Sequence, residues 1–203
     1  MNPFAPFVQQ SPANAEFLTD TRQFTLMSYF EAENYIPGID RTRSDGLYAR
    51  SATPLLYDIA AIHAKYGADT TTHATDAVYG FHSTAGRGAL DFTLNKNPVV
   101  AIWDGGGIDT QDCSGFADNQ YIDLRQGKYS DVGALTSNVV IAHNCDIENS
   151  VGGSGNDKLQ GRALGNTMDG SGGADTLVGA DGNDNLLGGA AMTGPMAATA
   201  MIP

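Results

Sequence analysis

The chain has few cysteines, little tryptophan and few basic residues: its 203 residues include 2 Cys, 1 Trp and 11 Lys or Arg, against 23 Asp or Glu. The net charge of −12 argues against nucleic acid or an anionic membrane surface as a partner. No apolar run approaches the roughly 20 residues that a membrane-spanning helix needs. Cys113 and Cys145 could form one bridge, but spacing alone does not decide it, and two free thiols are our expectation.

The chain also lacks the sequence signatures of common catalytic sites. A zinc-protease helix needs two histidines one turn apart, with a glutamate between them as general base. None of the histidines here is followed by Glu, and none pairs with another four residues on. A phosphate-binding loop, a G-x-S-x-G elbow and a C-x-x-C pair are absent as well. We therefore expect no catalytic residue and no bound zinc among the residues given. The histidines are His63, His73, His82 and His143.

Glycine, by contrast, recurs at a spacing of nine in the last quarter of the chain. Each unit of residues 152–188 begins with glycine, has a carboxylate or amide at its sixth position and an apolar residue at its eighth. A fixed short period predicts a solenoid in which each unit stacks on its neighbours. A flexible linker would not keep an apolar residue in register. The sixth positions are Asp157, Asn166, Asp175 and Asp184, and the eighth positions are Leu159, Met168, Leu177 and Leu186.

These units have the chemistry of a calcium site. Aspartate offers hard oxygen, glycine turns expose backbone carbonyls, and Ca²⁺ takes about 6–8 oxygen ligands. The nonapeptide is already established as the calcium-binding repeat of RTX proteins, which these units resemble. In a two-layered roll, turns on one side are two units apart, which pairs Asp157 with Asp175 and Asn166 with Asp184. We expect the first pair to bind better, and the second unit, where Arg162 and Leu164 replace glycines, to form a weak or empty site.

The chain before the repeats has a different sequence pattern. Thr53-Pro54 opens a predicted helix over residues 53–67, since proline fits the first helical turn and Gly67 provides the stop. His63 is expected to be a solvated residue on this helix, and Trp103 to pack at a strand end. We expect a domain boundary between residues 69 and 75. Strands are predicted over residues 77–82, 99–103, 121–124 and 139–142.

Several segments together resemble one family. Residues 20–30, DTRQFTLMSYF, resemble the Met-turn of serralysin-type zinc metalloproteases, which are M10 peptidases of the metzincin clan. Residues 53–67 resemble the helix that follows the Met-turn, and residues 78–81, 101–110 and 146–157 resemble the start of the family's C-terminal calcium domain. The resemblance implies a mainly β fold: a parallel β-roll, the RTX solenoid, over residues 71–190. It also implies a small, partly helical remnant of the protease domain over residues 1–70 and an irregular tail over 191–203.

The resemblance also implies site residues. Tyr29 matches an auxiliary zinc ligand, here vestigial, and Asp146 stands where the family has threonine in a T-x-E segment. Several calcium ions are expected. Their implied ligands, from backbone or side chain, are Arg87, Ala89, Asp91, Asp104, Gly106, Gly107, Asp109, Asp146, Glu148, Gly153, Gly155, Asp157, Asn166, Gly170, Gly172, Gly173, Asp175, Asp181 and Asp184.

Two hypotheses on function follow. The chain is either a non-catalytic calcium-binding module of a secreted serralysin-like protein, or a fragment of a calcium-stabilised zinc metalloendopeptidase whose H-E-x-x-H half is missing from it. A protease subunit completed by another chain is a third possibility. A protein substrate is expected only if the missing catalytic half is supplied. The N-terminal MNPFAPFVQQ has no visible cleavable signal, so the expected extracellular location rests on the resemblance.

Overall fold

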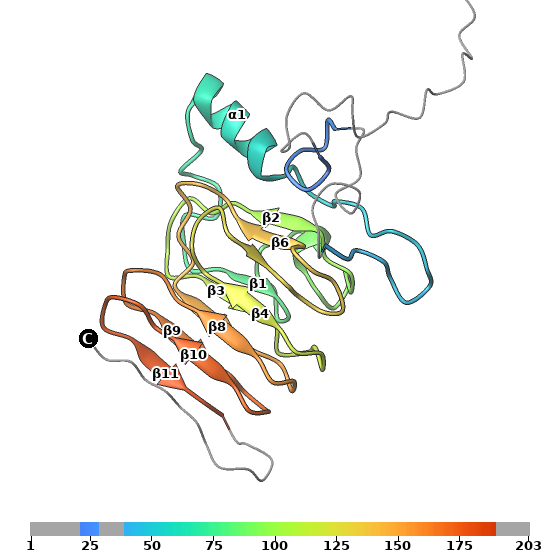
Figure 1. The fold of residues 1–203 in the computed structure, drawn as a ribbon. Helices are drawn as coiled ribbons and strands as arrows, with labels where there is room; N and C mark the ends of the chain where they lie inside the picture. The colour runs from blue at the N-terminus through green and yellow to red at the C-terminus, as the bar shows by residue number, and fades with distance from the viewer. Residues whose placement is uncertain (1–20, 29–38, 190–203) are drawn as a thin grey trace, which may run out of the picture.

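The computed structural model describes residues 21–28 and 39–189 (Figure 1). The candidate zinc ligand Tyr29 and the predicted tail over residues 191–203 lie outside the described residues. Within them the fold is mainly β, with one α-helix, α1, over Leu56–Tyr66. The search for a helix long and apolar enough to cross a membrane found none in the described part of the chain.

The strands are short and follow one another at regular intervals. Strands were predicted over four ranges before the repeats, and β1, β2, β4 and β6 confirm them within one or two residues at each end. The elements after α1 are β1 (Val78–Gly80), the 3₁₀ helix η3 (Gly88–Leu90), β2 (Val100–Ile102), β3 (Thr110–Asp112), β4 (Tyr121–Asp123), β5 (Tyr129–Ser130), β6 (Val139–Ile141), β7 (Asn149–Val151), β8 (Lys158–Gln160), β9 (Thr167–Asp169), β10 (Thr176–Val178) and β11 (Asn185–Leu187).

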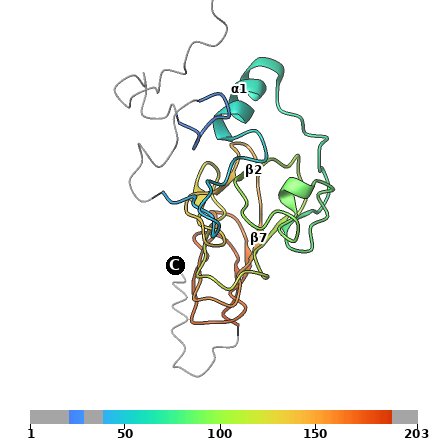
Figure 2. The ribbon, with the colours of Figure 1, turned by 90° about the vertical axis from the view of Figure 1, so that its right-hand side faces the viewer.

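The strands form a flattened coil, which confirms the predicted parallel β-roll. One sheet has the order β1-β3-β7-β9-β11, a second has β10-β8-β4, and a third has β2-β6-β5. From β7 to β11 the chain alternates between the first and second sheets, and Figure 2 shows these coils stacked one on another. Every strand pair is parallel except β5 with β6.

The eighth residue of each repeat unit points into the roll. Leu159 pairs with Leu177 across β8 and β10, and Met168 pairs with Leu186 across β9 and β11. Partners are therefore two units apart, as the period predicted. Leu159 and Met168 are fully buried, whereas Leu177 and Leu186 are only partly buried because β10 and β11 end the described stack.

Helix α1 covers the β2-β6 end of the roll (Figure 1). Leu56 packs on Ala101 and Val140, and Gly67 ends the helix with φ 85°, a conformation that favours glycine. His63, which was expected to be solvated, is partly buried. Its ring lies 4.1 Å from that of Trp103, edge to face, because Trp103 directly follows β2 beneath the helix.

Both cysteines are free and buried, which confirms the expectation of two free thiols. Burial raises the pKa of the Cys113 and Cys145 thiols. The thiolate is the reactive form of cysteine, so both side chains are unreactive core residues. The Cys145 sulfur accepts a hydrogen bond from the Asp104 backbone N–H at 3.2 Å, which fixes the start of the turn that follows β2.

Candidate metal-binding turns

The first glycine of each repeat unit lies against the carboxylate or amide at the sixth position of that same unit. A Cβ at Gly170 would lie 2.4 Å from Asp175 Oδ2, and one at Gly179 would lie 2.2 Å from Asp184 Oδ2. These distances are shorter than real side chains allow, so the first position requires glycine. The nine-residue period thus reflects a contact between the first and sixth residues of a unit.

Asp157 and Asp175 lie together, as their spacing predicted. The Asp157 backbone N–H donates to Asp175 Oδ1 at 2.8 Å. Asp157 Oδ1 accepts from the Gln120 N–H and its Oδ2 from the Gly153 N–H, both at 2.6 Å. Asp175 Oδ2, however, is buried and has no hydrogen-bond partner. Burial raises the pKa of both carboxyls, and the charge of Asp175 adds to the effect on Asp157.

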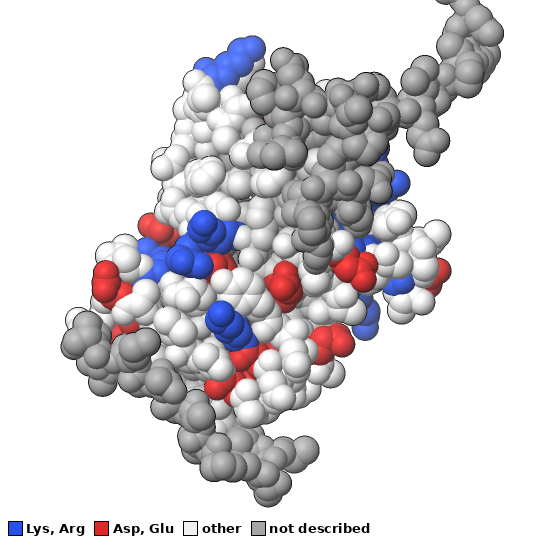
Figure 3. Space-filling view, in the orientation of Figure 1, with Lys and Arg blue, Asp and Glu red and all other residues white. Residues whose placement is uncertain are grey.

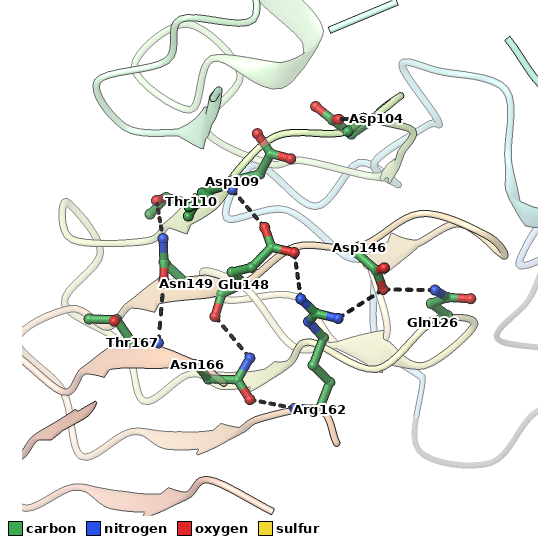
Figure 4. A network of polar contacts seen from close by, with 12 residues as sticks. Asp104, Asp109, Thr110, Gln126, Asp146, Glu148, Asn149, Arg162, Asn166 and Thr167 are labelled. Carbon is green, nitrogen blue, oxygen red and sulfur yellow. Dashed lines mark hydrogen bonds and ion pairs between the residues drawn. The ribbon is translucent and has the colours of Figure 1, made fainter. Parts of the chain in front are cut away.

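Asn166 and Asp184 also lie together, which confirms the second predicted pair. The Asn166 backbone N–H donates to Asp184 Oδ1 at 2.9 Å. Figure 4 shows Arg162 beside Asn166. The Arg162 guanidinium reaches Glu148 at 2.5 Å and Asp146 at 3.2 Å. This flank of the roll therefore contains a protein cation among its carboxylates.

A third group of acidic residues lies where β3 begins. Asp109 is fully buried; its Oδ1 accepts from the Ala77 N–H at 2.7 Å, and its Oδ2 has no partner. Burial raises the pKa of Asp109 to about 7, and the nearby charges of Asp104 and Glu148 act in the same direction. Asp104 Oδ2 accepts the Tyr79 hydroxyl at 2.5 Å. Asp109 thus presents a second buried carboxylate oxygen that no protein donor satisfies.

Glycine turns lie beside both unsatisfied oxygens. Gly106 and Gly107, between Asp104 and Asp109, have φ of 135° and 141°, a region that L side chains rarely adopt. Next to Asp157 and Asp175, a Cβ at Gly153 would lie 2.2 Å from the Phe116 carbonyl, and one at Gly173 would lie 2.0 Å from the Gly155 carbonyl. Because two backbone segments approach each other so closely at these glycines, the nearest oxygens to them are backbone carbonyls. Gly172 belongs to the same turn and donates its N–H to the Gly153 carbonyl at 3.0 Å.

The remaining candidates have less distinctive surroundings. Arg87 precedes η3, and Asp91 follows it. Asp91 accepts the hydroxyl and N–H of Thr93, and these hydrogen bonds lower its pKa. The Ala89 carbonyl accepts the Asn95 side-chain amide at 2.8 Å. Asp181 is exposed in the last turn. The ligand roles that the resemblance implies for these residues stay predictions.

The sequence analysis missed one degenerate coil. In β4, Ile122 pairs with Leu159, which places Gln120 beside Asp157 and Asn119 beside Asn156. The Asn156 N–H donates to Asn119 Oδ1, and the Ala174 N–H donates to Asn156 Oδ1, both at 2.8 Å. The segment NQYID at residues 119–123 resembles NDKLQ at 156–160 and could have been found from it, with Gly115 at the first position of its unit but Leu124 where the next unit would begin with glycine.

Side chains alone do not complete a metal site here. Within the described residues, no three His, Cys, Asp or Glu side chains are grouped so that they could hold a metal ion by themselves. Calcium, however, accepts backbone carbonyls as readily as carboxylates. The unsatisfied oxygens of Asp109 and Asp175, each beside a glycine turn, fit such a mixed set of ligands.

The family model of the peptidase M10 serralysin C terminus matches residues 68–193. Serralysin B of Dickeya chrysanthemi is 48% identical over 147 residues, which cover 72% of this chain and 29% of that protein. Metalloprotease AprA of Pseudomonas entomophila is 46% identical over 156 residues, covering 76% of this chain and 32% of that protein. Serralysin of Proteus mirabilis is 45% identical over 155 residues, covering 76% and 30%.

The chain thus spans about three tenths of the length of these relatives. The match covers the whole of the β-roll, including the repeat turns and the acidic turn before β3. This chain therefore belongs to the peptidase M10 serralysin C-terminal family.

Proposed function

We propose that this chain is a calcium-binding RTX β-roll module of a secreted, serralysin-like protein. The observation that supports it most is the buried Asp175 Oδ2, which no protein donor satisfies. A buried polar oxygen without a partner costs roughly 1–3 kcal/mol, and more when charged. A cation at this position would remove that cost.

The residues that would hold calcium fall into two groups. Asp157 and Asp175, with the turns at Gly153, Gly155 and Gly172, form the first. Asp104 and Asp109, with the turn at 106–107, form the second. A bound Ca²⁺ would supply positive charge to carboxylates that burial otherwise disfavours. The protein holds these oxygens on tightly turned backbone before the ion binds. Binding therefore loses little conformational entropy.

Calcium titration by calorimetry tests this proposal. We expect Asp175→Asn to lose affinity or stoichiometry, because the amide keeps the shape of the side chain but removes its charge. Asp45→Asn is the matched control: Asp45 is an exposed aspartate that pairs with Arg43 on a surface loop. A wild-type chain that binds no calcium, or equal binding by wild type and Asp175→Asn, would contradict the proposal.

We further propose an extracellular location and calcium ions as the partners of this module. Support comes from the net charge of −12, which suits a protein whose acidic turns bind divalent cations. On the face drawn in Figure 3, basic and acidic side chains are interspersed and form no basic stripe of the kind that binds nucleic acid.

A fragment of a zinc metalloendopeptidase is a second candidate. It is favoured by the chain's coverage of only 29–32% of relatives named as serralysins or metalloproteases. It is also favoured by exposed apolar residues near the Met-turn segment, where Met27 is 80% exposed. We expect the chain alone to digest no casein and to retain no stoichiometric zinc, because it offers no histidine pair with an adjacent glutamate. Chelator-sensitive cleavage with about one zinc per chain, abolished by Tyr29→Phe, would contradict this expectation.

A further inference from the structure

Arg162 is held between two acidic side chains at the second position of its repeat unit, where the other units have the small residues Gly153, Ser171 and Ala180. Its guanidinium contacts Glu148 Oε1 at 2.5 Å and Asp146 Oδ1 at 3.2 Å, and its side chain is only 11% exposed. Figure 4 shows it reaching from the turn after β8 to the segment before β7. Arginine is always protonated in proteins and presents a planar set of donors that suits carboxylates. It is therefore a fixed positive charge at the centre of this turn.

The acidic residues around Arg162 are already satisfied by protein donors. Glu148 Oε1 accepts from Arg162, Oε2 accepts from the Asp109 N–H at 2.8 Å, and the Glu148 carbonyl accepts from Asn166 Nδ2 at 2.9 Å. Asp146 Oδ1 also accepts from Gln126 at 2.9 Å. By contrast, Asp175 on the opposite flank keeps an unsatisfied buried oxygen, as does Asp109 in the neighbouring coil of the Arg162 flank. The turn of Asp146, Glu148 and Asn166 thus differs from both in that its acidic oxygens have protein partners.

Both departures of the second unit from the repeat pattern act together. Asn166 Oδ1 accepts the Arg162 backbone N–H at 2.9 Å, while its Nδ2 donates to the Glu148 carbonyl. An aspartate at position 166 could accept the first of these bonds but has no N–H for the second. Arginine adds one positive charge and asparagine removes one negative charge, and both changes lower the need for a metal cation at this turn.

We propose that the Arg162 guanidinium takes the place of a calcium ion on this flank. The turn formed by Asp146, Glu148 and Asn166 is held together by a protein cation and does not need the metal, whereas the Asp157–Asp175 flank does. This inference rests on the proposed calcium function, since it excludes one turn of the roll from that function. It also identifies one implied ligand group, Asp146 and Glu148 with Asn166, that does not fit calcium in this chain.

The test is the Arg162→Gln variant, melted in chelator and in calcium, with calcium stoichiometry measured by equilibrium dialysis. Without the guanidinium, Asp146 and Glu148 repel each other. We expect a lower melting temperature in chelator, recovery of most of that loss in calcium, and about one additional calcium per chain. Arg162→Lys keeps the charge and should keep the wild-type stoichiometry.

Arg125→Gln is the matched control. Arg125 also pairs with an aspartate, Asp123, at 2.6 Å, but with a single carboxylate beside β4. Its loss should lower the melting temperature equally in chelator and in calcium. The same calcium-independent loss in Arg162→Gln, with unchanged stoichiometry, would overturn the inference while leaving the proposed calcium function intact.

Two further outcomes are informative. If wild type binds no calcium but Arg162→Gln gains a site, the proposed function fails and the role of Arg162 stands. If Arg162→Gln folds in neither condition, the double variant Arg162→Gln/Glu148→Gln removes one acidic partner together with the cation. Recovery of folding in chelator by the double variant supports the inference, and failure to recover assigns Arg162 a packing role and overturns it.

Discussion

Aspartate at the sixth position of a repeat unit has two roles at the scale of single residues. One carboxylate oxygen accepts a backbone N–H from the coil two units earlier, as Asp175 does from Asp157 and Asp184 from Asn166. The other oxygen faces the first glycine of its own unit, where a Cβ at Gly170 would collide with Asp175. The same residue therefore connects neighbouring coils and, in the function proposed above, would present an oxygen to a cation.

At residue scale, Asp175→Ala should damage calcium-dependent stability more than Asn166→Ala. Asp175 has the unsatisfied buried oxygen and a full charge, whereas Asn166 is uncharged and its amide is bonded within the protein. The measurement is the rise in melting temperature between chelator and calcium for each variant. We expect a smaller rise for Asp175→Ala and a wild-type rise for Asn166→Ala. Equal rises would contradict the assignment of the metal to the Asp157–Asp175 flank.

Asp123 gives a prediction on pH. Burial alone would raise its pKa, but hydrogen bonds from Arg125 and Tyr121 outweigh burial and lower it. A carboxyl whose folded-state pKa is lowered contributes stability above its unfolded value of about 3.9 and loses it as the pH falls through the folded value. The stability gap between wild type and Asp123→Asn in urea unfolding should therefore shrink between about pH 5 and about pH 3. A constant gap over that range would show that the charge of Asp123 is not responsible.

At the scale of elements, one short strand per unit buries one apolar side chain. Because alternate units lie in different sheets, each side chain packs against one two units away, as Met168 does against Leu186. Parallel coils of this kind satisfy their backbone hydrogen bonds only through neighbouring coils. Burial accordingly decreases toward β11, where the described stack ends.

Met168→Ala should be more destabilising than Leu186→Ala. Met168 is fully buried, and truncation of such a side chain to alanine costs about 2–5 kcal/mol, while the partly buried Leu186 should cost less. Urea unfolding in saturating calcium measures both variants without a difference in metal binding. Equal costs would contradict this difference in burial between Met168 and Leu186.

The elements that sequence could predict are those with a period or a helix signal. Glycine spacing predicted β8 to β11 and their pairing two units apart, and Pro54 with Gly67 predicted α1. The coil through Gln120 was missed because its turn has one glycine, Gly115, where each repeat unit has at least two. The contact of His63 with Trp103 was missed because it joins segments 40 residues apart in sequence. The position of Arg162 could be recognised as a departure, but its two acidic partners come from another coil.

At the scale of the whole molecule, the roll is a stack of acidic turns in a chain of net charge −12. Buried carboxylates such as Asp109 and Asp157 have raised pKa values because their charged forms lose solvent. A nearby cation offsets this cost, and we infer two kinds here: calcium at the Asp157–Asp175 flank and at the Asp104–Asp109 turn, and the Arg162 guanidinium at the turn of Glu148 and Asn166. The stability of the fold should accordingly depend on calcium in part.

Thermal unfolding followed by circular dichroism, in millimolar calcium and in chelator, tests the central claim most directly. A ligand that binds only the folded chain adds RT ln(1 + [L]/Kd), which is about 2.7 kcal/mol at a concentration of 100 Kd. We predict a higher melting temperature and a stronger β signal in calcium, with no such gain in magnesium at the same concentration, since Mg²⁺ gives up its water less readily. Identical spectra and melting temperatures in calcium and in chelator would contradict the account.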